Sequence, residues 1–233
     1  MTTTPSRTPA AAVRDPAGSQ VGRVLLALSA ALSPLLLAVT IGVLPYGTDD
    51  STREIVTAIA EDEALVELAQ WAWVFGLVLL VPGTLAVGLL AMTRAPKLGL
   101  WGLVVLGTGW MAIATTPSMD QVVLGGLDEG VSREALVDVT DGTFALAVNA
   151  IPSFYFVAAH VIGAILLGAA LLRGRTVPVW AAWLLILSMP LNVVGFASGL
   201  LPVTVLSFLM MAVAFGAAGL VVARHGTGWV RAR

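Results

Sequence analysis

Charged residues alternate in sign from one polar segment of this chain to the next, with long apolar runs between the segments. Segments 49–67 and 120–141 together hold thirteen of the fourteen acidic residues but only two arginines. The other ten basic residues lie before residue 24, within 94–97 and 173–175, and after residue 223. Lys and Arg collect in the cytoplasmic loops of multi-pass membrane proteins. We therefore expect an even number of membrane crossings with both termini in the cytoplasm.

Six apolar segments are long enough to cross a hydrocarbon core about 30 Å thick, which takes about 20 helical residues. Apolar residues make up 58% of the chain, charged residues only 11%, and the mean hydropathy is +0.94. The expected spans cover residues 24–45, 68–92, 98–116, 148–172, 178–197 and 202–223. The sequence therefore predicts an all-α protein, a six-span transmembrane helical bundle over residues 21–224.

Two regions decide the span count and the tails. Residues 176–223 contain no Asp, Glu, Lys or Arg and are too long for one crossing, so a break is expected near Ser198–Pro202. Residues 1–20 are rich in Thr, Pro and Ala without periodicity, which predicts a disordered cytoplasmic tail. Residues 225–233 are expected to form a second cytoplasmic tail.

The two acidic segments resemble each other, and so do the apolar segments that follow them. Four residues recur 79 positions later, in the pairs Gln70 and Asn149, Phe75 and Phe154, Arg94 and Arg173, and Trp101 and Trp180. This pattern suggests a repeated unit of span, outer loop and span, although any two apolar hairpins with basic inner turns share part of it. Each acidic segment also predicts a short helix: Ser51 and Glu54 have capping-box spacing, and Ser132 precedes a helix ending near Gly142.

Several classes of function lack their motifs in this chain. The sequence has no cysteine, no phosphate-binding loop, no HExxH and no GxSxG motif, and its second histidine lies in the C-terminal tail. We therefore expect no cofactor, no metal site and no nucleic-acid partner, and the lipid bilayer as the surrounding medium. Eleven of the twelve basic residues are arginine, and Ala, Gly and Val are abundant, which is typical of a high-GC bacterial genome and favours a bacterial inner membrane.

His160 is the ionisable side chain that lies well inside an expected span, where such groups are functional candidates by default. Asn149 and Ser153 share its helix face, and Asn192 and Gln70 on other spans can face the same interior. These five residues form the predicted binding site for a small or lipophilic molecule. In the alternative interpretation, they only join helices, through hydrogen bonds worth about 0.6 kcal/mol each.

Two classes of function remain open from the sequence. The first is a protein that binds or passes a small or lipophilic molecule, or acts as an accessory or sensing subunit. The alternative is an integral-membrane enzyme acting on a lipid or isoprenoid, with Glu67, Asp120 and Asp141 as acids or bases beside His160. Convergence of these carboxylates and His160 on one apolar pocket would favour the enzyme, whereas scattered carboxylates would favour binding.

Overall fold

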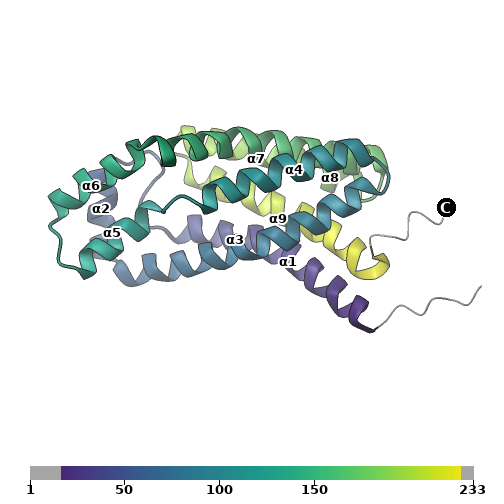
Figure 1. The fold of residues 1–233 in the computed structure, drawn as a ribbon, viewed down its shortest axis with the longest axis horizontal. Coiled ribbons are helices and arrows are strands. Elements are labelled where there is room, and N and C mark those ends of the chain that lie inside the picture. Colours follow the sequence, from purple (N-terminus) through teal and green to yellow (C-terminus); the bar gives the residue numbers. More distant parts are fainter. Residues whose placement is uncertain (1–16, 227–233) are drawn as a thin grey trace, which may run out of the picture.

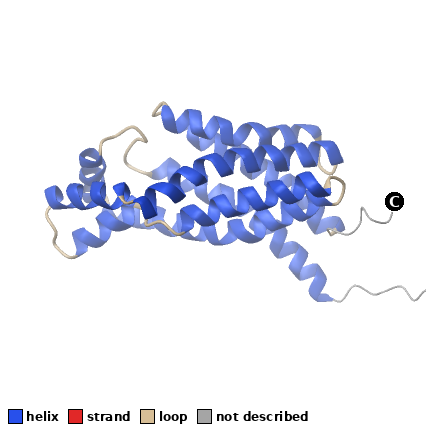
Figure 2. Cartoon of the chain, turned by 45° about the horizontal axis from the view of Figure 1, so that its top comes forward, coloured by secondary structure: helices blue, strands red, loops and turns tan. Residues whose placement is uncertain are grey.

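In the computed structural model, which describes residues 17–226, every regular element is a helix (Figure 2). The described residues form nine helices and no strand. Six of these helices are long and apolar enough to cross a membrane. The structure therefore confirms the predicted all-α class and is consistent with a multi-pass membrane protein.

The six long helices correspond one by one to the expected spans. They are α1 (Ala17–Val43), α3 (Glu63–Met92), α4 (Pro96–Ala114), α7 (Ala147–Gly174), α8 (Val179–Ala197) and α9 (Leu201–His225). The expected break near Ser198–Pro202 separates α8 from α9, and Gly199 turns the chain there with a φ of +66°. Helix α1 includes residues 17–20 of the predicted disordered tail, and the remainder of both predicted tails lies almost wholly outside the described residues.

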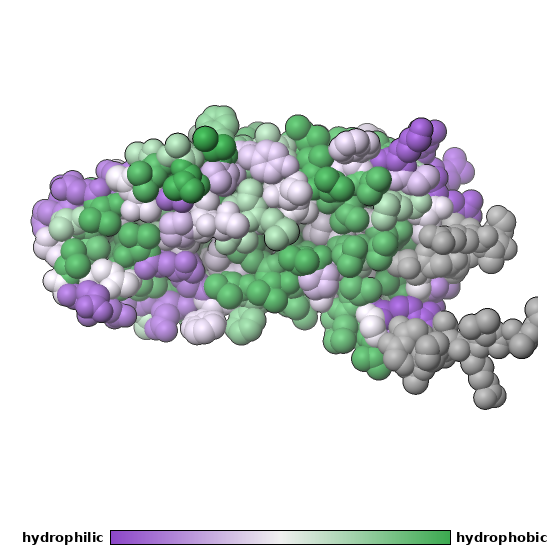
Figure 3. Space-filling view, in the orientation of Figure 1, coloured by the Kyte–Doolittle hydropathy of each residue, from purple (hydrophilic) through white to green (hydrophobic). Residues whose placement is uncertain are grey.

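The long helices form a closed ring in the order α1, α3, α4, α7, α8, α9, and α9 packs against α1 to complete it (Figure 1). The α3–α4 and α7–α8 turns lie at the end of the ring where α1 begins and α9 ends. We call this the basic end, since Arg94, Lys97, Arg173 and Arg175 lie at or beside those turns. The opposite end, where the two acidic segments lie, is called the acidic end. Hydrophilic side chains gather at both ends and hydrophobic ones between them (Figure 3).

Three short helices, α2 (Thr52–Glu61), α5 (Met119–Asp128) and α6 (Arg133–Ala145), lie together at the acidic end and are called the acidic cap (Figure 1). They share a small hydrophobic core that is separate from the core of the ring. Its buried residues are Ile55, Val56, Ile59, Val66, Val123 and Leu136. Burial of apolar surface therefore holds the three cap helices together and, through Val66, joins them to α3.

Local signals explain where the cap helices begin. Both hydrogen bonds of the predicted capping box between Ser51 and Glu54 are present, and the Ser132 side chain accepts from the backbone N–H of Ala135. Two features differ from expectation. Helix α6 continues past Gly142 to Ala145, and α5 was not predicted, although Ser118 caps its first turn.

Glycines let the long helices approach backbone to backbone, mainly from the middle of the bundle towards the basic end. A Cβ atom on Gly102 would lie 2.7 Å from the backbone nitrogen of Leu167, and one on Gly163 would lie 2.5 Å from that of Leu106. Both contacts join α4 to α7. Such small-residue contacts are how helices pack closely in membranes, where burial of apolar surface drives association only weakly.

Candidate functional site

His160 is almost wholly buried in α7, with 2% of its surface exposed. Its Nδ1 atom lies 2.7 Å from the carbonyl oxygen of Phe156, one helical turn earlier. A carbonyl oxygen only accepts, so Nδ1 carries the proton of the neutral imidazole and Nε2 is left with its lone pair. Among the described residues, no hydrogen bond of standard geometry reaches Nε2, although the Asn192 side chain lies near enough to interact with the ring. A buried acceptor without a donor is costly, by about 1–3 kcal/mol.

This imidazole lines a cavity of about 380 Å³ between α7 and α8, which we call the α7–α8 cavity. Its other walls are Phe156, Val157, Asn192, Val193, Phe196 and Ala197. Val157 and Phe196 are exposed on the outer surface of the ring, so the cavity opens towards the face that lipid would cover. The cavity is thus mainly apolar, with polar groups only at His160 and Asn192.

Two further contacts fix the polar side of this cavity. Asn192 donates from Nδ2 to the hydroxyl oxygen of Ser207, 2.9 Å away on α9, and that hydroxyl donates to the Thr204 carbonyl at 2.6 Å. The His160 ring stacks on Phe156 with centroids 4.5 Å apart, and Phe156 contacts Trp110 at 4.9 Å. His160 and Asn192 are therefore held in fixed orientations at the cavity wall.

A second group of buried polar side chains surrounds Asp120, which lies in the first turn of α5 and is only 6% exposed. Its Oδ1 accepts a hydrogen bond from the Tyr46 hydroxyl, and its Oδ2 accepts one from Nε2 of Gln70. The Gln70 carbonyl oxygen in turn accepts from the Ser118 hydroxyl at 2.8 Å. These bonds join α3, α5 and the loop that follows α1.

The Asp120 carboxylate faces a cavity of about 270 Å³ beneath the acidic cap, which we call the vestibule. Its walls come from α1, α2, α3, α5, α8, α9 and the loop after α1, and they include Tyr46, Trp73 and Phe196. Thr48 in that loop donates to the carbonyl oxygen of Phe196 at 3.3 Å, which ties the loop to α8. Phe196 lines both cavities, so the vestibule and the α7–α8 cavity are neighbours.

Electrostatics at Tyr46 keep its hydroxyl a donor. Burial raises the pKa of Tyr46 well above its ordinary value, and the negative charge of Asp120 and their hydrogen bond raise it further. An acid with a raised pKa stays protonated over a wider pH range. The phenol therefore donates to the carboxylate at any physiological pH.

The remaining predicted site residues lie apart from His160. Asn149 donates to the Thr143 carbonyl and Ser153 donates to the Asn149 carbonyl, both at 2.8 Å, so the two side chains bond within their own stretch of chain. Glu67 is exposed near the start of α3. Asp141 is exposed on α6 and accepts from the Thr52 hydroxyl at 2.6 Å. The structure brings His160 together with Asn192, and Gln70 together with Asp120, but the three carboxylates share no cavity with His160.

Several site residues were not singled out by the sequence. Tyr46 is one of only two tyrosines and follows directly on the first expected span, a position that could have marked it. Ser118 lies two residues before Asp120, with the spacing of a helix N-cap. Trp110 and Phe156 read as ordinary apolar residues of their spans, and no sequence signal distinguishes them from lipid-facing aromatics.

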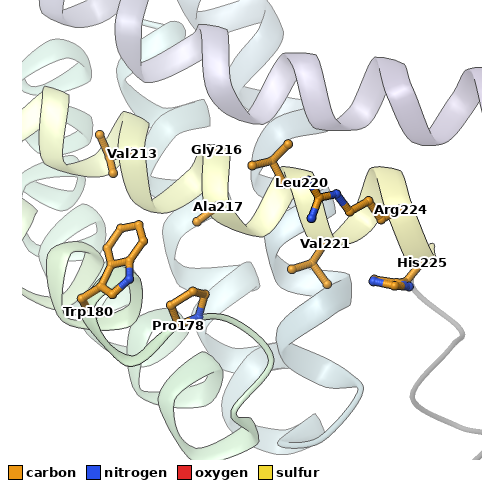
Figure 4. Close-up of a pocket in the computed structure, with 9 residues that line it drawn as sticks. All are labelled: Pro178, Trp180, Val213, Gly216, Ala217, Leu220, Val221, Arg224 and His225. Atoms are coloured by element: carbon orange, nitrogen blue, oxygen red, sulfur yellow. The ribbon is translucent and has the colours of Figure 1, made fainter.

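A further groove of about 440 Å³ lies at the basic end, between the start of α8 and the last turns of α9 (Figure 4). Trp180 and Pro178 form one side, and Val213, Ala217 and Val221 of α9 form another. Arg224 and His225 lie at its polar end. None of the predicted site residues lines this groove, whose wall is mainly apolar.

Comparisons of the chain with protein-family models, with curated proteins and with solved structures find no significant match. Function therefore has to follow from the chemistry of the two cavities near the acidic end.

Proposed function

We propose that this protein binds a small lipophilic molecule in the α7–α8 cavity, as a multi-pass protein of a bacterial inner membrane. The supporting observation is the buried Nε2 atom of His160, which makes no hydrogen bond of standard geometry among residues 17–226 and lines a mainly apolar cavity that opens on the outer surface of the bundle. Binding sites for small molecules are typically apolar with a few fixed polar groups. Binding is also the step that a carrier, a channel and a sensing subunit have in common.

The ligand's polar group follows from the protonation of the imidazole. With the proton on Nδ1 held by the Phe156 carbonyl, Nε2 can only accept. The matching ligand is an apolar molecule that carries a hydroxyl or N–H donor. Such a donor would satisfy the lone pair that the protein leaves buried, and the apolar remainder would lie against Phe156, Val193 and Phe196.

The positions of the carboxylates support binding rather than the lipid-modifying enzyme. Acid and base catalysis requires the groups within hydrogen-bond reach of the same reacting atoms. Glu67 and Asp141 are exposed, and Asp120 is bonded to Tyr46 and Gln70 in the vestibule. No carboxylate lies on the wall of the α7–α8 cavity formed by these described residues.

We further propose that the basic end faces the cytoplasm, with both termini on that side. The support is the distribution of charge, because ten of the twelve basic residues fall at or beyond that end in the sequence order. The α7–α8 cavity, near the acidic end, would then lie in the outer half of the membrane. A lipophilic ligand would reach it by lateral diffusion from that leaflet.

The direct test is to purify the protein in mild detergent, extract it with organic solvent and identify copurifying molecules by mass spectrometry. We expect an apolar compound with a hydroxyl or N–H group, present with wild type and lost or strongly depleted with His160→Ala. The matched control is Ser153→Ala, because Ser153 lies two turns away on the same helix and bonds only to Asn149. Equal amounts of the compound in all three proteins would contradict the proposal.

A second comparison separates hydrogen bonding from proton transfer. His160→Gln keeps a side chain that hydrogen-bonds but does not titrate, and His160→Leu fills the same space with an apolar group. Binding retained by His160→Gln and lost in His160→Leu would show that the imidazole serves as a hydrogen-bonding group. If every variant binds normally and only thermal stability falls, His160 merely joins helices and the proposal fails.

A further inference from the structure

We propose that the vestibule beneath the acidic cap is a binding site for a small organic cation, an ammonium group that pairs with the Asp120 carboxylate. This site lies beyond the proposed function, since it is a different cavity with a different ligand chemistry. The two proposals can therefore fail separately.

The first support is a buried carboxyl group that has no positively charged neighbour in the described wall of its cavity. Both oxygens of Asp120 accept hydrogen bonds, from the neutral Tyr46 hydroxyl and the neutral Gln70 amide, so the carboxylate is held as an acceptor on both sides. Removing a carboxylate from water costs several kcal/mol even after the protein relaxes around it. Hydrogen bonds from neutral donors offset part of this desolvation free energy, and a hydrogen bond from a positively charged donor would offset more of it.

The helix to which Asp120 belongs does not supply that charge. Asp120 lies in the first turn of α5, where the helix macrodipole stabilises an anion by about 0.3–1 kcal/mol, and up to about 2 in partly buried sites. This contribution is smaller than the desolvation cost of several kcal/mol. Among the described residues that line the vestibule there is no Lys, Arg or His. A bound cation would therefore not compete with a basic side chain of the described cavity wall for the Asp120 carboxylate.

The second support is the aromatic composition of the wall. Tyr46, Trp73 and Phe196 line the same cavity as the carboxylate. Aromatic faces attract cations, and cages of aromatic rings are how proteins recognise quaternary ammonium ligands. A volume of about 270 Å³ suits a small organic cation better than a bare metal ion. Within residues 17–226, no group of three or more His, Cys, Asp or Glu side chains could hold a metal.

The third support is the field around the entrance. The two segments that form the acidic end contain thirteen acidic residues and two arginines. A surface of one sign raises the local concentration of the opposite ion and steers it towards a cleft. The acidic end would therefore favour cations at the mouth of the vestibule and disfavour anions.

The competing explanation is that Asp120 only fastens the acidic cap to the bundle. In that case its loss would lower stability without affecting any ligand. A test must therefore read out binding as well as folding, and it must separate charge from size.

The experiment is equilibrium dialysis of the full-length protein in detergent with radiolabelled choline, at fixed ionic strength. We expect saturable binding, and competition by unlabelled choline at least about tenfold stronger than by its neutral isostere, in which carbon replaces the nitrogen. Asp120→Asn should abolish binding. Asp128→Asn, at the exposed end of the same helix, should bind like wild type.

A second variant keeps the test decisive if Asp120→Asn does not fold. Trp73→Leu leaves both hydrogen bonds of Asp120 in place and removes one aromatic wall, so it should weaken choline binding by about tenfold. No saturable binding by wild type, equal competition by the neutral isostere, or unchanged binding in folded Asp120→Asn or Trp73→Leu would overturn the proposal. None of these outcomes depends on His160.

Discussion

The two ends of this bundle differ in the side chains that hold their helices together. Towards the basic end, glycines bring helices together backbone to backbone, as at Gly102 against Leu167, and the connecting turns are short. At the acidic end, the connections carry three additional helices with their own hydrophobic core, and hydrogen-bonded polar side chains surround two cavities. Close-packed glycine contacts leave no room for a ligand between α4 and α7, and the groove at the basic end lies apart from them, between α8 and α9. Fixed polar groups beside an apolar cavity, in contrast, are typical of a binding site.

This difference indicates that one level of the bundle fixes the spacing of the helices and another level carries the cavity side chains. The contacts between α4 and α7 fix the spacing of the helices at one level, and the same two helices carry Trp110 and His160 at another. A rigid scaffold beside a functional cavity keeps the side chains of that cavity in place. The following predictions test whether the two ends differ in this way, beginning with the largest expected effect.

The sidedness of the two ends should give an all-or-none result. The chain has no cysteine, so each single-cysteine variant carries one reactive thiol. Cysteines replacing Ser51 and Ser132 at the acidic end should react with an impermeant thiol reagent in intact cells. Sequence alone suggests Ala95 and Gly174 as the opposite pair, but Ala95 is buried, so the exposed Pro96 is the better site at the basic end. It should react only after permeabilisation, and labelling of Pro96→Cys in intact cells would reverse the orientation.

The glycine contact between α4 and α7 should be sensitive to a single methyl group. Gly102→Ala places a Cβ atom 2.7 Å from the Leu167 backbone nitrogen, so the helices must separate, at a cost of about 1–3 kcal/mol. The control is Gly107→Ala on the same helix, where no atom lies within 4 Å of the added Cβ. Unfolding in mixed detergent micelles measures both. Equal stabilities would show that the basic half is not tightly packed.

The polar network of the vestibule should contribute about as much to stability as the glycine contact, and its contribution should be specific to one tyrosine. Tyr46→Phe removes a hydrogen bond to a buried carboxylate and should destabilise the protein by about 1.5–3 kcal/mol. Tyr155→Phe removes the 2.6 Å bond to Thr108 on the exposed surface of the ring and should cost about 0.6 kcal/mol or less. The same unfolding assay applies. A larger loss of stability in Tyr155→Phe than in Tyr46→Phe would mean that burial does not strengthen the hydrogen bond to Asp120.

The smallest effect should be a loosening of α2 as the pH falls. Hydrogen bonds from the Ser51 hydroxyl and from its backbone N–H lower the pKa of Glu54 below its ordinary value. A carboxyl with a lowered pKa stabilises the folded state above its unfolded pKa, and this contribution is lost as the pH falls through the lowered value. The protection factors of α2 amides, which correct for the slower intrinsic exchange at low pH, should therefore fall on acidification. The cap of α6, made by the Ser132 hydroxyl without a carboxylate, should not respond in this way.

The positions of the six long helices follow from hydropathy, because the length of each apolar run determines them directly. The cavities follow less directly. His160 is visible in the sequence as a histidine within an apolar run, and its partner Asn192 lies 32 residues later in another helix. Helical spacing assigned Asn149 and Ser153 to the same face, yet both bond locally to the backbone, since a hydroxyl or amide within a helix can reach a nearby carbonyl.

Asp120 shows the limit most clearly. In the sequence it is one of thirteen acidic residues that topology alone explains, and five of the others lie in its own segment, 120–141. Only its position at the end of a span groups it with Glu67 and Asp141. Only the folded chain separates it from the rest, because Tyr46 and Gln70 come to it from positions 74 and 50 residues away. The tertiary packing of the cap, which periodicity does not encode, decides which carboxylate is buried.

The ring closes between its first and last members, and this has a consequence for biosynthesis. Of the six long helices, α1 leaves the ribosome first and its neighbour α9 leaves last, so their contact joins the helices that are furthest apart in this sequence. Until α9 is inserted, the side of α1 around Ala27 and Ala31 that receives Gly219 and Gly216 must face lipid. Lipid tails solvate such small apolar side chains about as well as a neighbouring helix does. The partly assembled ring is therefore not strongly destabilised before α9 is inserted. The ring of six helices closes only when α9 is inserted beside α1.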